Sequence, residues 1–126
     1  MKTLALVAHD NKKNALLTWA KKHVEELLKH ELIGTSHTAQ LLNDVLDLNV
    51  KPFGHGPNGG DILLAAKILA NEVEGIIFLI DQQSPHGHEH DIQTLIRTAV
   101  INDIPIALNT ATADYLIQDL KPKKEA

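Results

Sequence analysis

The sequence predicts a single three-layer α/β domain in which helices cover both faces of a five-stranded, mainly parallel sheet. Short runs of apolar residues alternate along the chain with segments whose apolar residues recur at helical spacing. A strand that is apolar at every position is typical of a parallel sheet, because helices cover such a sheet on both sides. The 126 residues suffice for one domain of this type and are too few for two ordinary ones.

The expected strands and helices alternate in order along the chain. The first strand reads Leu-Ala-Leu-Val-Ala, and the fourth reads Gly-Ile-Ile-Phe-Leu-Ile. We expect strands at residues 4–8, 31–34, 48–51, 75–80 and 104–108. We expect helices at residues 10–28, 38–46, 61–70, 92–100 and 112–120.

Helical spacing also predicts which side chains face the sheet. Asp10 stands where it can cap the first helix. The residues expected to face inward are Leu16, Trp19, Ala20, Val24, Leu27 and Leu28 in the first helix, Ile62, Leu63, Ala65, Ala66 and Leu69 in the third, and Ile92, Leu95, Ile96, Ala99 and Val100 in the fourth.

Composition argues against several classes of function. Cysteine is absent, which excludes thiol catalysis, cysteine-ligated zinc and disulfides, and is typical of a reducing cytoplasm. A formal net charge of −4 and an aromatic content of 3% argue against a nucleic-acid-binding protein. No apolar segment is long enough to span a membrane, and the first residues do not resemble a signal peptide. We therefore expect a soluble cytoplasmic domain at residues 1–120 and a solvated tail at 121–126.

Polar and glycine-rich residues follow each expected strand. In an open α/β sheet, ligands bind outside the carboxyl ends of the strands, so these five segments are expected to share one edge. They are His9 and Asp10 after the first strand, 34–38 after the second, 54–61 after the third, 81–91 after the fourth and 109–114 after the fifth.

Two of these segments suit an anion, although each also has a purely structural explanation. Hydroxyls and N–H groups at 35–38 can bind a phosphate at a helix N-terminus, with Lys13 as a counter-charge, but taken alone these residues favour plain helix capping. Four glycines within 54–60 let backbone N–H groups approach an anion, but they also suit a tight turn. Asp61 could be only a cap for the helix that it opens. Next to an anion, however, it would repel that ligand, and a role as a base acting on the ligand explains its presence.

The segment after the fourth strand carries three alternating histidines. His86, His88 and His90 stand beside Asp91, and such a group can ligate zinc. We favour the alternative, in which one histidine is functional and no metal is bound. A Ser–His–Asp hydrolase is excluded in its α/β-hydrolase form, because the chain has no Gly-x-Ser-x-Gly motif.

Taken together, these segments resemble the methylglyoxal synthase family from about residue 4 to residue 116. The resemblance implies an enzyme that converts dihydroxyacetone phosphate to methylglyoxal and inorganic phosphate, without a metal or organic cofactor, as a homohexamer. Phosphate would be the product and a possible inhibitor. The matching segments are 5–10 with Lys13, Gly-Pro-x-Gly-Gly-Asp at 56–61, His88-x-x-Asp91, 95–97 and 109–114.

The resemblance also implies roles for individual residues. Asp61 corresponds to the base that removes a proton from the substrate carbon, and His88 to the histidine that handles protons on the substrate oxygens. Asp91 and Asp10 correspond to supporting carboxylates. The residues implied to bind the substrate or its phosphate are His9, Lys13, Thr35, His37, Thr38, His55 and Gly56.

The chain departs from the family in its phosphate-binding residues. His37 stands where the family has a threonine, His55 stands where it has a serine, and the C-terminal tail lacks the family's arginine. We expect these changes to alter affinity and to leave the chemistry in place. The alternative function is a non-catalytic regulatory module of the same fold that binds a phosphorylated metabolite, as in carbamoyl phosphate synthetases.

Overall fold

The five strands form one parallel sheet in the order β3-β2-β1-β4-β5, which confirms the predicted fold class. The computed structural model describes residues 3–53, 60–80 and 89–119, except for the side chains of residues 10, 60–63, 89–92 and 119. The strands are β1 (Thr3–Ala8), β2 (Glu31–Gly34), β3 (Val50–Pro52), β4 (Val73–Leu79) and β5 (Ile106–Ala107).

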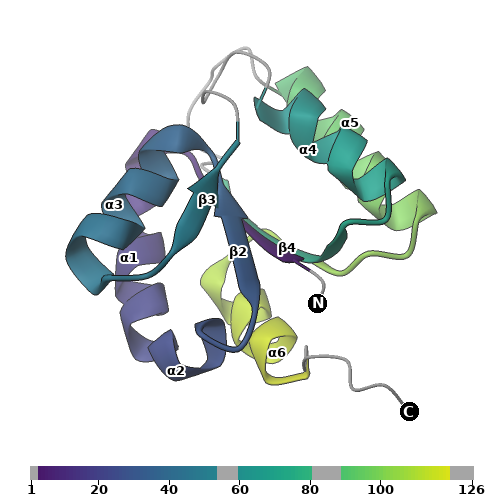
Figure 1. The fold of residues 1–126 in the computed structure, drawn as a ribbon. Helices are drawn as coiled ribbons and strands as arrows, with labels where there is room; N and C mark the ends of the chain where they lie inside the picture. The colour runs from purple at the N-terminus through teal and green to yellow at the C-terminus, as the bar shows by residue number, and fades with distance from the viewer. Residues whose placement is uncertain (1–2, 54–59, 81–88, 120–126) are drawn as a thin grey trace.

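Helices cover both faces of this sheet (Figure 1). One face carries α1 (Lys13–Lys22), α2 (Val24–Leu27), α3 (Ser36–Leu46) and α6 (Thr110–Asp119), and the other carries α4 (Gly60–Leu69) and α5 (Glu89–Ile101). A short 3-10 helix, η1 (Asp10–Lys12), leads from β1 into α1. Within the described residues, none of the helices combines the length and apolar character needed to cross a bilayer.

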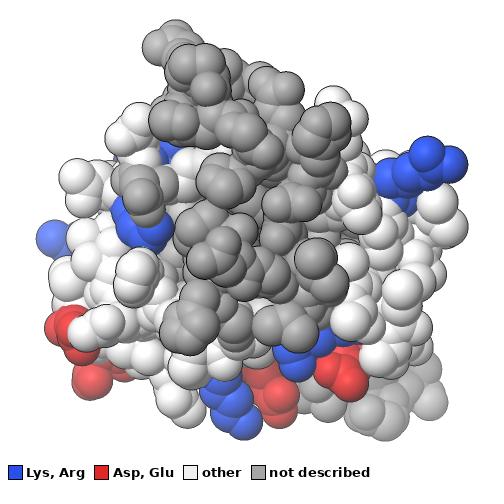
Figure 2. All heavy atoms as spheres, turned by 90° about the horizontal axis from the view of Figure 1, so that it is seen from above, with Lys and Arg blue, Asp and Glu red and all other residues white. Residues whose placement is uncertain are grey.

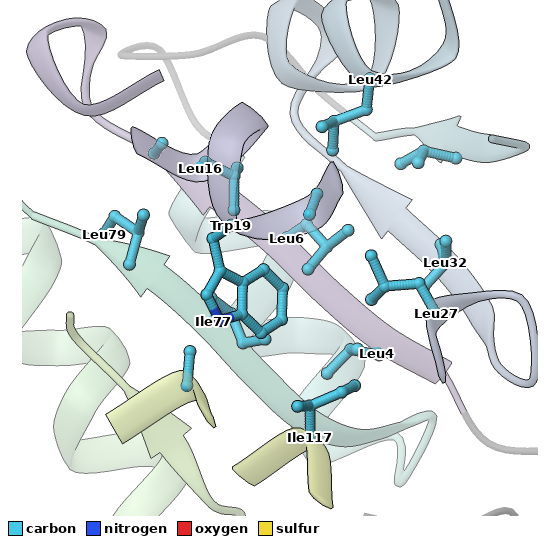
Figure 3. Packing of buried hydrophobic residues seen from close by; sticks show 14 of the residues in the cluster. Leu4, Leu6, Leu16, Trp19, Leu27, Leu32, Leu42, Ile77, Leu79 and Ile117 are labelled. Carbon is cyan, nitrogen blue, oxygen red and sulfur yellow. The ribbon is translucent and has the colours of Figure 1, made fainter. Parts of the chain in front are cut away.

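The central strand β1 supplies side chains to two separate cores. Leu4 and Leu6 point into the core beneath α1, α3 and α6, where Trp19 is packed among leucine and isoleucine side chains (Figure 3). Ala5 and Val7 belong to the core beneath α4 and α5. This alternation follows from the two-residue period of a strand, and it explains why an all-apolar run was required.

Among the described side chains, four that were expected to face inward are exposed, namely Leu28, Ala66, Leu69 and Val100. The side chains of Ile62, Leu63 and Ile92 lie outside the described part of the structure. In α4 the buried side chains are instead Leu64 and Ile68. Most residues of this helix are apolar, so spacing alone does not single out one face. The contact with α5 and with the sheet decides which side of the helix is covered.

The first predicted helix is divided into three pieces, and Asp10 is not the cap of α1. Residues 10–12 form η1, and Lys12 occupies the N-cap position of α1 without a side-chain hydrogen bond. The backbone turns again at His23, which ends α1 and precedes α2. Two short turns of this kind let one amphipathic segment follow the twisted surface of the sheet.

Gly34, the last residue of β2, is packed too closely against β1 to carry a side chain. A Cβ atom at this position would lie 2.7 Å from the Leu6 carbonyl oxygen and 3.3 Å from Val50 Cγ1. The Leu6 oxygen belongs to the backbone of the central strand and has little room to move. Gly34 therefore keeps the ends of β1, β2 and β3 close together, directly before Thr35.

We predict that Gly34→Ala lowers the free energy of unfolding by about 1–3 kcal/mol, the usual cost of inserting a methyl group into a well-packed interior. Urea denaturation measures this change. Glu31→Ala, at an exposed position of the same strand, is the control and should stay within about 0.5 kcal/mol of the wild type. Equal stability of Gly34→Ala and the control would contradict the close packing.

Candidate functional site

The carboxyl ends of all five strands meet at one edge of the sheet, because every pairing is parallel. The chain order reverses at β1: β2 and β3 extend the sheet on one side, and β4 and β5 extend it on the other. Ligands of open α/β sheets bind outside the carboxyl ends at such a reversal. The topology therefore defines the candidate site at the edge where β1 and β4 end.

His9 lies at this reversal, directly after β1, and contacts the end of β4 and the start of the next helix. Its N–H donates to the Leu79 carbonyl at 3.0 Å, and its own carbonyl accepts the Lys12 N–H at 2.8 Å. Its half-buried ring stands edge-on to Phe78, with the ring centroids 5.4 Å apart. The chain then runs through η1 to Lys13, the first residue of α1. His9 and Lys13 thus both lie near the carboxyl end of β1.

Thr35 and Thr38 form a buried hydroxyl pair at the start of α3, beside β1. Thr35 Oγ1 donates to Thr38 Oγ1 at 3.2 Å, and the two residues are 6% and 0% exposed. Thr35 is the N-cap residue, yet its side chain does not hydrogen-bond a backbone N–H. The plain capping explanation is therefore wrong for this hydroxyl. His37, in the same first turn, is exposed.

Asp61 and Asp91 are positioned by two helices that pack against each other. Asp61 is the second residue of α4, and Asp91 is the third residue of α5. Both helices follow strands of the parallel sheet, so both begin toward the carboxyl edge. The side chains of both residues, and that of Asp10 in η1, lie outside the described part of the structure.

The remaining predicted site residues, His55, Gly56 and His88, lie outside the described residues. The same holds for His86, and the side chain of His90 is also not described. Within the described part of the chain, no group of three or more metal-ligating side chains comes together.

Two polar side chains that follow β5 form hydrogen bonds that cap α6 and join it to α1. The Asn109 Oδ1 atom accepts the Thr112 N–H at 2.8 Å and so caps α6. Asp114 Oδ1 accepts the Trp19 Nε1–H at 2.8 Å and lies 3.2 Å from His23 Nε2. This cluster joins α6 to α1 and satisfies the N–H of a buried indole. Asn109 and Asp114, two of the residues at 109–114 that match the family, thus each have a structural role.

Figure 2 looks down on the edge at which the site is expected. Among the described residues, acidic side chains appear toward the lower and lower-left margins of this view, whereas basic side chains also border the undescribed segments on the left.

The fold and the topology define the chain as an open parallel α/β domain whose candidate site lies at the carboxyl ends of its strands. Residues 15–108 match the family model described as the MGS-like domain. The chain belongs to this family, the methylglyoxal synthase-like domains.

Curated relatives extend this similarity over most of the chain. The methylglyoxal synthases of Clostridium acetobutylicum and Coxiella burnetii are each 42% identical over 117 residues, which is 93% of this chain and 81% and 82% of theirs. That of Pseudoalteromonas atlantica is 43% identical over 92% of this chain and 86% of its own. The crystal structure of methylglyoxal synthase from Elizabethkingia anophelis superposes with a TM-score of 0.88 at 39% identity, covering 94% of this chain and 78% of that one.

Proposed function

We propose that this protein is a methylglyoxal synthase, which converts dihydroxyacetone phosphate to methylglyoxal and inorganic phosphate. The observation that carries the proposal is the similarity to proteins of that name over more than nine-tenths of the chain. The reaction needs a base, groups that handle protons on the oxygens, and a site for the phosphate.

In the first step a base removes a proton from the hydroxymethyl carbon, which leaves an enediolate, and protonation of its oxygen gives the enediol. We assign this role to Asp61 by its match to the family motif at 56–61. Its place in the first turn of α4, toward the carboxyl edge, is consistent with the assignment. His88 would then move protons on the substrate oxygens, with Asp91 and Asp10 as supporting carboxylates.

In the second step the C–O bond to phosphate breaks, and the enol that remains rearranges to methylglyoxal. Elimination requires that bond to stand out of the enediol plane, so the phosphate has to be held firmly. We assign this task to Thr35, His37 and Thr38 at the start of α3, with Lys13, His9, His55 and Gly56. The buried Thr35–Thr38 pair at a helix N-terminus supports an oxyanion site on the α3 side of this edge.

We predict that Asp61→Asn retains near wild-type thermal stability and lowers turnover by about 10²- to 10⁴-fold. Asp61 is the second residue of α4 and not its N-cap. Asparagine keeps the size of aspartate and an oxygen that accepts hydrogen bonds, so a purely structural role in this first turn would be preserved. Loss of a general base costs turnover of this size. Both quantities are measured on the same protein, turnover by following methylglyoxal and phosphate release from dihydroxyacetone phosphate.

Asp44→Asn is the control, because it removes an exposed carboxylate from α3 and should change neither quantity. Turnover of Asp61→Asn within a few-fold of the wild type would exclude Asp61 as the base. Wild-type protein that binds dihydroxyacetone phosphate without releasing phosphate would support the regulatory module instead.

We predict that His37→Thr combined with His55→Ser lowers KM for dihydroxyacetone phosphate and leaves kcat nearly unchanged. The two changes restore the hydroxyls of the family pattern, and contacts made equally to substrate and transition state affect KM alone. Steady-state kinetics of the single and double variants test this. An unchanged KM in the double variant would mean that the two histidines already bind phosphate well or do not contact it.

We further propose that the protein assembles as a homohexamer. The exposed apolar side chains Leu69, Val100 and Ile101 support this, because they lie at the carboxyl-terminal ends of the neighbouring helices α4 and α5. Apolar residues that a helical pattern marks as buried, but that one chain leaves exposed, suit a contact with a second copy.

Sedimentation at micromolar concentration should therefore give a species about six times the 13.8 kDa chain. Replacing Leu69 and Val100 together by glutamate should shift it toward smaller species, because charged residues are disfavoured in the core of an interface. Tyr115→Glu, at another exposed position, is the control. A wild-type monomer would contradict the assembly.

A further inference from the structure

We infer that Asn43 is a positioning residue: its side chain fixes the strand from which the chain enters the glycine-rich segment at 54–61. The inference rests on the proposed function, which assigns His55, Gly56 and Asp61 to the reaction. Asn43 itself lies outside that set and matches none of the motifs that mark the family.

The strand β3 is weakly held by the sheet alone. It has three residues, lies at the sheet edge and pairs only with β2. Its last residue is Pro52, which has no N–H to donate. Phe53 adds one hydrogen bond, from its N–H to the Gly34 carbonyl at 2.8 Å. A strand this short needs a further contact to keep its position.

Asn43 supplies that contact by pairing with both polar backbone groups of Val50. The Val50 N–H donates to Asn43 Oδ1 at 2.7 Å, and Asn43 Nδ2 donates to the Val50 carbonyl at 3.0 Å. The side-chain amide therefore provides the donor and acceptor that a neighbouring strand would provide. The Val50 side chain is only 1% exposed, so the pairing holds a residue anchored in the core.

The helix that carries Asn43 also carries the hydroxyl pair of the proposed phosphate site. Thr38 precedes Asn43 by five positions on α3, which corresponds to roughly 7.5 Å along the axis. The Asn43 carbonyl accepts the Asp47 N–H at 3.0 Å, where the backbone turns with φ of 57° to end the helix. Asn43 thus couples the rigid body of α3 to the strand that leads toward the other proposed phosphate contacts and the base.

A positioning role and a purely stabilising role predict different kinetics. A variant that is merely less stable contains less folded enzyme, which lowers the apparent kcat and leaves KM unchanged. A variant whose β3 is displaced changes the geometry of the folded enzyme, so KM changes as well. Small misplacements of groups that hold a substrate can cost up to ~100-fold in rate.

The test compares Asn43→Ala and Asn43→Asp with two controls, assayed well below their melting temperatures. Asn43→Asp keeps an acceptor for the Val50 N–H and loses the donor to its carbonyl, so it serves if the alanine variant does not fold. Asp44→Ala changes the exposed neighbour on α3. Ile117→Val removes a buried methylene from α6 and should lower Tm by a few degrees without touching β3.

We expect Asn43→Ala to raise KM for dihydroxyacetone phosphate at least ~5-fold and to lower kcat/KM by ~10- to 100-fold. Asn43→Asp should give a smaller rise, and both controls should keep the wild-type KM. Hydrogen exchange at the Val50 amide should accelerate in the alanine variant, which reports the lost pairing independently of activity.

Faster exchange together with a raised KM supports the inference. Faster exchange with an unchanged KM overturns it, as does an unchanged exchange rate or an equal rise in KM for Ile117→Val. A wild-type protein inactive toward dihydroxyacetone phosphate overturns the proposed function and this inference with it, whereas an active wild type with unaltered Asn43 variants overturns the inference alone.

Discussion

Strand β1 is the element on which the rest of the structure depends, because it is paired on both edges and covered on both faces. Its backbone groups bond to β2 on one side and to β4 on the other. Its side chains alternate between the two cores. A residue of the wrong size or polarity in β1 would disturb both helical layers, and unpaired backbone groups there would have no access to water. From Leu4 to Ala8 the strand is therefore made of small and medium apolar residues.

The same strand also fixes the position of the candidate site. Since β1 is central and the chain order reverses beside it, the segments after β1, β2 and β4 arrive at neighbouring points of one edge. His9, which directly follows β1, donates a hydrogen bond to Leu79 and stands edge-on to Phe78, both of which belong to β4. Gly34 packs closely against the Leu6 backbone of β1, so the next residue, Thr35, also lies near the end of β1. Parallel pairing thus turns residues far apart in the sequence into neighbours, and it does so through backbone geometry.

Much of the fold was predictable because the patterns that encode it are local. The apolar runs of β1 and β4 and the spacing of Leu95 and Ala99 in α5 were enough to place strands, helices and their order. The inward sides of α4 and the end of α5 were predicted wrongly at Leu69 and Val100. Their side chains are apolar, and nothing in a helical period tells whether an apolar residue meets the sheet, another helix or a second molecule.

The candidate site was predictable in part, for a different reason. The residue types after each strand indicated an edge rich in anion-binding groups, and parallel topology brings those segments together. No pattern in the sequence indicated that Thr35 would bond to Thr38 in place of a backbone N–H. Nor did any pattern mark Asn43, whose partner Val50 is seven positions away in a different element.

The sequence by itself determined the α/β class, the number of strands and the edge of the sheet at which the candidate site lies. It could do so because alternation and apolar spacing act over a few residues. Only the tertiary structure decided which face of each helix is covered, which hydroxyl bonds to which, and that one amide side chain holds the edge strand. These contacts form between different segments of the chain. The number of residues between two segments does not tell how close they lie in the folded protein.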